Sequence, residues 1–141
     1  MRIVSVILLC VMAASAVATP INCPAPHDIT RIDGEYAWRS NDSLFEGYFA
    51  VPQFGRGQSS EVTQFLEARW IQLTDLAKAK GFVECDYAGN VEGEIIRFSL
   101  LNAQAGPKPS AHTWSCSFHP PFPSSQCTCA GDPGICTFEK T

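Results

Sequence analysis

The chain has 141 residues, of which 45% are hydrophobic and 17% are charged, and its formal net charge is −4. Without Arg2, which lies in a leader sequence, 9 basic residues stand against 14 acidic ones, so the mature charge is −5 with no basic run. An acidic chain of this kind is not expected to bind nucleic acid, or an anionic membrane surface, through its charge.

The first 18 residues have the pattern of a secretory signal peptide. Arg2 supplies the positive charge, residues 3–14 are apolar, and Ala16-Val17-Ala18 matches the small-x-small cleavage pattern. The apolar stretch is too short to span a bilayer, and no later segment reaches the roughly 18 uncharged apolar residues that a membrane helix needs. We therefore expect residues 19–141 to form one exported domain, periplasmic or secreted, with no membrane span.

Six cysteines are left once Cys10 is removed with the leader, and an even number in an exported chain predicts disulfide bonds. We favour a bond between Cys23 and Cys85, because Cys23 lies near the mature N-terminus and Cys85 lies alone in an apolar run. The other four are expected to pair among themselves, and Cys127 and Cys129 are too close to bond to each other comfortably. The six positions are Cys23, Cys85, Cys116, Cys127, Cys129 and Cys136.

Short apolar runs at 36–38 and 44–49 predict strands in the first part of the chain, separated by a turn at 41–43. The following segment, 59–81, fits two structures. Its apolar residues follow helical spacing, with Ser59 or Ser60 as a cap, whereas alternation over 66–70 fits a strand. Length favours a helix, at least over 73–80, and the choice stays open. The residues with helical spacing are Val62, Phe65, Leu66, Trp70, Leu73 and Ala77.

The clearest local element is a predicted β-hairpin over residues 82–100. A two-residue Gly89-Asn90 loop would place Cys85 opposite Glu94. Alternation then puts one set of side chains on the core face, and it leaves Glu84 diagonal to Arg97 on the other face as a weak ion pair. The expected core set is Val83, Cys85, Tyr87, Ile96, Phe98 and Leu100.

The C-terminal segment, 102–141, is rich in proline and cysteine, and six of the ten prolines lie between Pro107 and Pro133. Proline cannot donate a backbone hydrogen bond, so we expect this segment to be mostly loop, held in place by its disulfides.

A zinc site is the first functional candidate, because five residues of the types that zinc prefers lie within 18 positions. Oxidation of the cysteines in an exported chain argues against it, and no metal is assigned. Thiol exchange at Cys127-Thr128-Cys129 is a second candidate, but the flanking residues predict a loop instead of the helix N-terminus that activates redox cysteines. The five possible zinc ligands are His112, Cys116, His119, Cys127 and Cys129.

Acid–base hydrolysis is a third candidate, since several carboxylates cluster around the predicted hairpin. Such clusters are usually solvated strand faces, and neither a Gly-x-Ser-x-Gly elbow nor a glycine-rich phosphate loop is present. No catalytic residue and no cofactor is therefore assigned. The carboxylates are Glu84, Asp86, Glu92 and Glu94, and the histidines available as partners are His27, His112 and His119.

Aromatic residues, which make up 11% of the chain, are the remaining candidates for a binding role. Trp38, Trp70 and Trp114 are most simply packing residues, but two of them exposed together would form a platform for a sugar or a peptide. These three are the candidate ligand-contact residues.

Short motifs spread over the whole mature chain resemble a family of small exported proteins, mostly from Gram-negative bacteria, that is known only as a domain of unknown function. The resemblance implies an extracytoplasmic location, a β-rich fold and two disulfides that use Cys23, Cys85, Cys116 and Cys136, with Cys127 and Cys129 as an addition. It implies no activity, and it favours a strand at 65–70. The motifs are Cys23-Pro24, Phe65-x-x-Ala68-x-Trp70, Val83-Glu84-Cys85-Asp86-Tyr87, Trp114-x-Cys116 and Cys136-Thr137-Phe138.

The sequence therefore predicts a mainly β fold: a small antiparallel β-sandwich-like domain with at most one short helix, stapled by two or three disulfides. The function that fits is non-catalytic binding of an extracytoplasmic protein or glycan. A small hydrolase that uses Asp or Glu with His, and a purely structural envelope protein, are the alternatives.

Overall fold

The computed structural model describes residues 20–33, 36–41, 49–54, 57–73, 80–100, 108–109, 113–118 and 124–139. The predicted signal peptide lies outside the described residues. Within them, the one helical element is a 3-10 turn, η1 (Pro26–Asp28). No helix in this part of the chain has the length and apolar character needed to cross a membrane.

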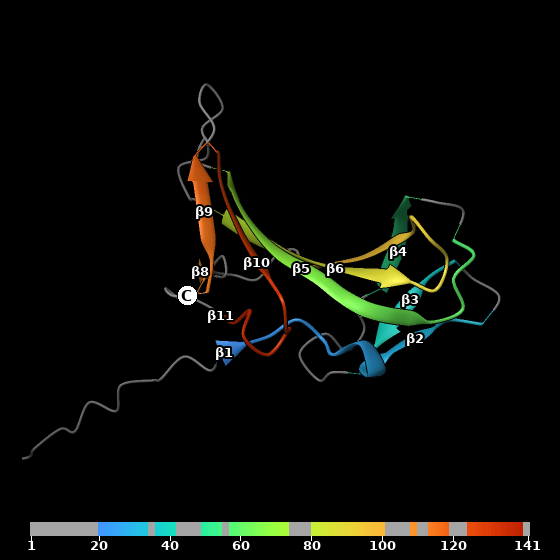
Figure 1. The fold of residues 1–141 in the computed structure, drawn as a ribbon. Helices are drawn as coiled ribbons and strands as arrows, with labels where there is room; N and C mark the ends of the chain where they lie inside the picture. The colour runs from blue at the N-terminus through green and yellow to red at the C-terminus, as the bar shows by residue number, and fades with distance from the viewer. Residues whose placement is uncertain are drawn as a thin grey trace, which may run out of the picture.

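Two antiparallel sheets make up the fold, which confirms the mainly β class (Figure 1). The large sheet has eight strands in the order β2-β3-β4-β7-β6-β5-β10-β9, and the small sheet has three in the order β1-β11-β8. The large sheet is formed by β2 (Ile29–Arg31), β3 (Trp38–Ser40), β4 (Phe49–Phe54), β5 (Val62–Leu73), β6 (Lys80–Gly89), β7 (Ile95–Leu100), β9 (Ser115–Phe118) and β10 (Ser124–Ala130). The small sheet is formed by β1 (Pro20–Ile21), β8 (Lys108–Pro109) and β11 (Phe138–Glu139).

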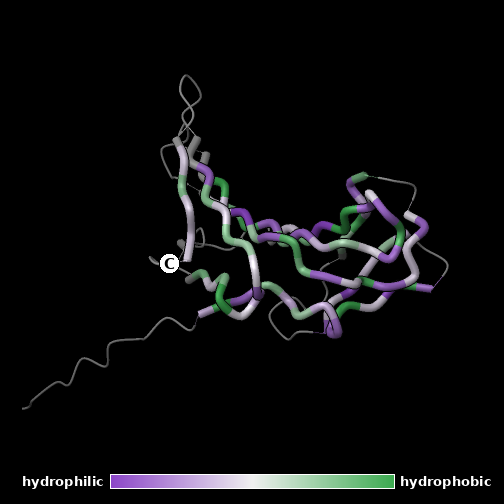
Figure 2. Tube along the Cα trace, in the orientation of Figure 1, coloured by the Kyte–Doolittle hydropathy of each residue, from purple (hydrophilic) through white to green (hydrophobic). Residues whose placement is uncertain are grey.

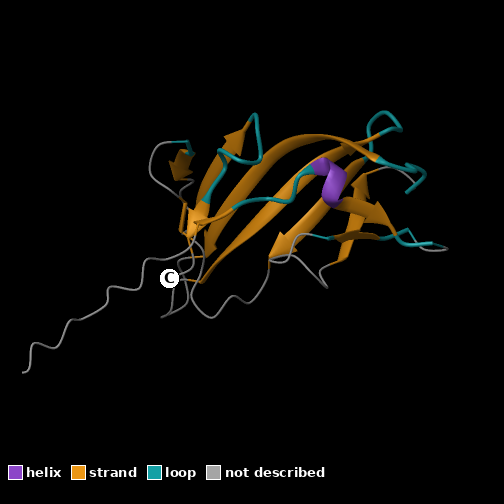
Figure 3. Ribbon diagram, turned by 90° about the horizontal axis from the view of Figure 1, so that it is seen from below, coloured by secondary structure: helices purple, strands orange, loops and turns teal. Residues whose placement is uncertain are grey.

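One face of the large sheet carries the hydrophobic core, and we call it the inner face; the opposite face is the outer face. Hydrophobic and hydrophilic residues are interspersed along the strands of the large sheet, as expected of a sheet with one buried face (Figure 2). The N-terminal segment, including η1, crosses the inner face (Figure 3). It is fixed there by a disulfide from Cys23 to Cys85 and by a 2.7 Å hydrogen bond from the Tyr87 hydroxyl to the Pro24 carbonyl.

The segment that resembled a helix is the longest of the described strands, β5. Its pairing with β6 shifts by one residue at Thr63 and again at Leu66, so each is the extra residue of a β-bulge. The residues that face inward are therefore spaced by three positions at each bulge, which imitates the period of a helix. The predicted helix over 73–80 falls mostly on residues outside the description, and its ends, Leu73 and Lys80, belong to β5 and β6. The inward-facing residues are Val62, Phe65, Ala68 and Trp70.

The hairpin of β6 and β7 is present, but the predicted register is wrong. Cys85 lies opposite Phe98 and not opposite Glu94, because the connection is longer than two residues and includes Gly93 with a positive φ of 79°. The shift is four residues, an even number, so the described side chains of the hairpin strands keep their predicted faces. Five members of the predicted core set are 0% exposed, and the side chain of Leu100 lies outside the description.

The described residues of the C-terminal segment lie mostly in strands, which corrects for this part the loop prediction from its prolines. It supplies β8, β9, β10 and β11 to the two sheets. Strands β9 and β10 contain no proline, and Pro109 lies in β8, an edge strand of the small sheet where a missing donor is tolerated.

Two further predictions concern the early strands. Trp38 is buried at the start of β3 as expected, but Tyr36 is 67% exposed and precedes the strand. Most of the predicted strand at 44–49 lies outside the described residues, and its last residue, Phe49, begins β4.

Candidate functional site

A network of charged side chains occupies the centre of the outer face. It comprises Glu67 and Arg69 on β5, Glu84 and Asp86 on β6, and Arg97 on β7. Antiparallel pairing brings them together, because Asp86 lies opposite both Glu67 and Arg97, and Glu84 lies opposite Arg69. We call these five residues the ion-pair network.

Asp86 is the hub of the ion-pair network. Its carboxylate accepts two hydrogen bonds from Arg97, at 2.6 and 2.7 Å, and one from Arg69 at 3.1 Å. Glu84 lies 3.0 Å from Arg69 and 3.5 Å from Arg97, which confirms the predicted diagonal pair with Arg97. A two-pronged guanidinium–carboxylate contact of this kind fixes the geometry of both side chains.

The arginine side chains cover Asp86, whose side chain is only 5% exposed. Burial raises the pKa of Asp86 from 3.8 to about 6; Arg69 opposes the rise, and Glu84 and Glu67 add to it. The desolvation of the carboxylate therefore outweighs the attraction of its cationic neighbour.

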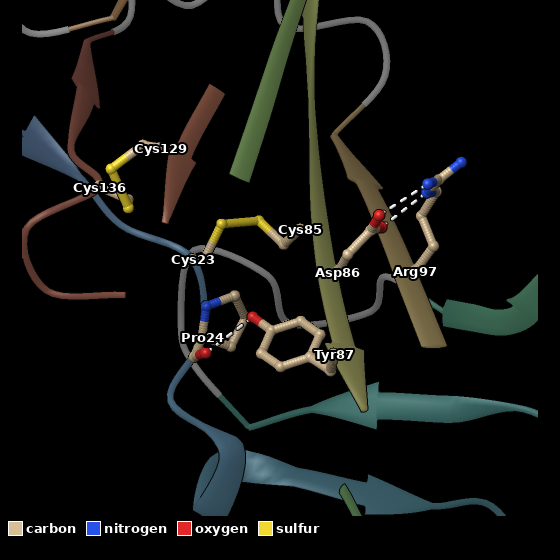
Figure 4. The surroundings of a disulfide bond; sticks show 8 residues. All are labelled: Cys23, Pro24, Cys85, Asp86, Tyr87, Arg97, Cys129 and Cys136. Carbon is tan, nitrogen blue, oxygen red and sulfur yellow. Dashed lines mark hydrogen bonds and ion pairs between the residues drawn. A yellow bond between two sulfur atoms is a disulfide. The ribbon is translucent and has the colours of Figure 1, made fainter. Parts of the chain in front are cut away.

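Strand β6 connects the ion-pair network to the core. Cys85 and Tyr87 point to the inner face, where they hold the N-terminal segment, while Asp86 between them points outward to Arg97 (Figure 4). The strand is consequently anchored on both faces, and the outer face has a rigid centre.

Beside the ion-pair network lies an apolar patch formed by the exposed Val51 and Phe54 and the half-buried Ile95, which we call the β4 patch. Val51 lies opposite Arg97, and Phe54 lies opposite Ile95. Residues three apart in a regular strand face opposite sides, but a β-bulge at Gln53 turns Phe54 to the same side as Val51. Val51 is 52% exposed and Phe54 is 58% exposed.

The three tryptophans do not gather on this face. Trp38 is 2% exposed and Trp70 is 9% exposed, both within the core. Trp114 is half-buried against the core and donates a hydrogen bond to the Thr137 carbonyl at 2.8 Å. A role of these side chains in ligand contact stays a prediction, and the structure does not bring them together as one exposed platform.

Three disulfides are formed, and the predicted bond between Cys23 and Cys85 is among them. The four C-terminal cysteines pair among themselves, Cys116 with Cys127 and Cys129 with Cys136. The two-disulfide pattern implied by the family resemblance is therefore wrong for the C-terminal bond, since Cys116 and Cys136 bond to Cys127 and Cys129 and not to each other.

The disulfide pairing bears directly on the zinc site and the thiol exchange that were considered for the C-terminal segment. Cys116, Cys127 and Cys129 are bonded sulfurs and not free thiolates, and His112 and His119 lie outside the description. No cluster of three potential metal ligands is found among the residues that are described. Cys127 and Cys129 bond to different partners, so they do not form a redox pair with each other.

Apart from Glu84 and Asp86, which share the ion-pair network, the predicted hydrolytic residues are dispersed. Glu92 is exposed in the β6–β7 connection, and the carboxylate of Glu94 is buried, where it accepts hydrogen bonds from the Ser59 amide at 2.9 Å and hydroxyl at 2.7 Å. His27, the described histidine, is on exposed η1 beside Asp28, in the segment that crosses the inner face. It therefore lies on the other side of the sheet from Asp86.

Sequence reasoning missed Glu67 and Arg69 as partners of Asp86, and Ser59 as the partner of Glu94. Glu67 and Arg69 would have been found by treating 62–73 as a strand next to β6. Ser59 carried no local signal, because it reaches Glu94 from 35 positions away.

These features define a class: an antiparallel β domain, stapled by disulfides, with one buried face and one charged, partly apolar face. A family model described as "Protein of unknown function (DUF3757)" matches residues 16–139. The chain belongs to this family. No curated protein and no solved structure matches it.

Proposed function

We propose that this is an exported, non-catalytic protein that binds an extracytoplasmic protein through the outer face, at the β4 patch. Three disulfides indicate an oxidising compartment, and the signal-peptide pattern of residues 1–18 supplies the route to it. The observation that carries the binding proposal is the bulge at Gln53, which exposes Phe54 beside Val51.

Exposed apolar side chains in a polar surround are typical of protein interaction sites. A regular strand would have turned Phe54 to the inner face, so the bulge places an aromatic side chain on the outer face, where it is 58% exposed. Bulges often re-aim a side chain in this way at a functional site. The ion-pair network next to it provides a polar rim whose geometry is already fixed before a partner binds.

A protein partner is favoured over a glycan by the tryptophans. Stacking on a sugar ring needs an exposed aromatic plane, and Trp38 and Trp70 are buried. A small hydrolase is supported less well, because the carboxyl oxygens of Asp86 are engaged by arginines and His27 lies on the other side of the sheet.

The test is a comparison of two variants of the mature, oxidised protein. Val51→Ser with Phe54→Ser removes the β4 patch, while Ile135→Ser removes an apolar side chain that is 50% exposed and lies in the β10–β11 connection. Proteins of the cell envelope that bind the immobilised wild type are identified, purified, and titrated against each variant.

We expect the double substitution to weaken binding of the purified partner at least about tenfold, as the loss of a central anchor does, and Ile135→Ser to leave it unchanged. Equal affinity of the double variant and the wild type would refute the assignment of the β4 patch. Binding on a glycan array, with the same dependence on Phe54, would replace the protein partner by a sugar.

A further inference from the structure

The disulfide between Cys116 and Cys127 differs from the other two in its exposure. Cys116 is exposed, whereas the other bonded cysteines are all 3% exposed or less. A thiol in solution must reach a sulfur along the axis of the bond in order to open it, so access decides which disulfide reacts. The buried positions are Cys23, Cys85, Cys127, Cys129 and Cys136.

This disulfide also has a distinct place in the fold. Cys116 lies on β9, the last strand of the large sheet, directly opposite Cys127 on β10, with a Cα–Cα distance of 3.9 Å. Among the described strands, β9 pairs only with β10. Opening the bond therefore leaves the pairing of the other seven strands in place.

We propose that the Cys116–Cys127 bond is a thiol–disulfide exchange site that reacts with an extracytoplasmic dithiol. The thiolate of the dithiol attacks the Cys116 sulfur, which forms a mixed disulfide, and the Cys127 sulfur leaves with the electron pair and takes up a proton. The second thiol of the reagent then attacks its own sulfur in the mixed disulfide and releases Cys116 as a thiolate. The protein disulfide gains two electrons, and the dithiol is oxidised to a disulfide.

The direction of attack follows from the different exposure of the two cysteine residues. Cys116 is the accessible member, and Cys127, at 2% exposed, is opposite both Cys116 and Trp70 in the sheet. The consequence of exchange is also local: β9 loses its covalent link to β10, while the bonds that hold the N-terminal segment and the β10–β11 connection stay closed. This inference is independent of the β4 patch, because it concerns the opposite end of the strand order.

The test is a graded reduction of the oxidised mature chain with dithiothreitol, stopped by alkylation and followed by peptide mass spectrometry. We expect Cys116 and Cys127 to be alkylated together, at least about tenfold faster than the cysteines of the two buried bonds. Opening of Cys129–Cys136 or Cys23–Cys85 first, or opening of all three bonds at one rate, would overturn the proposal.

Two further measurements separate local from global opening. In the protein with only this bond reduced, amide hydrogen exchange should rise within 115–118 and stay unchanged within 83–87; a rise throughout the chain would contradict the proposal. In a variant with Cys116→Ala and Cys127→Ala, the fast phase of alkylation should vanish. The wild-type measurement decides the question alone if that variant does not fold.

Discussion

Asp86 combines near-complete burial with cationic partners on a face that is otherwise open to solvent. Its side chain is 5% exposed, and two hydrogen bonds from Arg97 hold it in one orientation. Burial of the carboxylate raises its pKa to about 6. The free energy of unfolding therefore depends on pH through this side chain.

The sign of this dependence follows from the raised pKa. The folded protein binds a proton at Asp86 more tightly than the unfolded chain, so protonation favours folding between about pH 4 and 6. The free energy of unfolding should increase as the pH falls through this window. The contribution, about 2–3 kcal/mol, is present below pH 4 and is lost as the pH rises through about 6.

Replacing Asp86 by Asn should remove this part of the pH dependence. Urea denaturation at several pH values between 4 and 7 measures it, with Asp28→Asn, a partly exposed carboxylate on η1, as the control. The difference in free energy of unfolding between wild type and Asp86→Asn should change across the window. A difference that is the same at every pH would show that Asp86 titrates as it does in the unfolded chain.

At the scale of elements, the turn between β6 and β7 is held by a contact that is distant in sequence. Glu94 accepts hydrogen bonds from the Ser59 amide and hydroxyl, and the same hydroxyl accepts one from the Val91 amide at 3.2 Å. These bonds tie the segment before β5 to the turn. They therefore help to set the register of three neighbouring strands.

Truncation of Glu94 to Ala should leave the buried Ser59 amide without its acceptor and lower the free energy of unfolding by about 1–3 kcal/mol. The matched control is Glu92→Ala, two residues earlier in the same turn, where the side chain is exposed. Chemical denaturation of both variants measures the difference. Equal stability of the two variants would show that the Ser59 contact contributes nothing measurable.

The bulges explain which elements could be predicted from the sequence. Strand β6 has unbroken alternation, and the faces of Cys85, Asp86 and Tyr87 were predicted correctly even though the register was not. Strand β5 has extra residues at Thr63 and Leu66, so its inward side chains are spaced like those of a helix. A bulge is fixed by pairing with the neighbouring strand, and a single strand's sequence does not carry that information.

The same limit applies to the candidate site. The pair of Glu84 and Arg97 was predictable, because both lie in one hairpin. Arg69 was not predicted, because segment 59–81 was left open between a helix and a strand, although Arg69 lies only 17 positions from Asp86 in the neighbouring strand. The β4 patch was not predicted, because it depends on the long-range pairing of β4 with β7 and on the bulge in β4. The loop predicted from the proline content of the C-terminal segment was wrong for β9 and β10, because both strands fit between the prolines.

At the scale of the whole molecule, the disulfides close loops of very different length. Cys23 and Cys85 are 62 residues apart, and Cys129 and Cys136 are 7 apart. If the bonds act by restricting the unfolded chain, the longer loop should stabilise more, by about 4 kcal/mol against about 2 kcal/mol.

Paired substitutions to Ala test this order. Removing Cys23 and Cys85 should lower the free energy of unfolding more than removing Cys129 and Cys136, and all four side chains are buried, so cavity effects are comparable. Denaturation with guanidinium measures both. A larger loss from the shorter loop would show that the N-terminal segment is held mainly by its other contacts, such as the Tyr87 hydrogen bond to Pro24.

The proposed binding of an extracytoplasmic protein and the proposed exchange at Cys116–Cys127 both require export of the chain into an oxidising compartment. Mass spectrometry of the protein isolated from its native host tests this most directly, as intact mass and as non-reduced peptides. We predict a chain that begins at Thr19 and carries three bonds, Cys23–Cys85, Cys116–Cys127 and Cys129–Cys136. A chain that still carries residues 1–18, with all seven cysteines as free thiols, would contradict it.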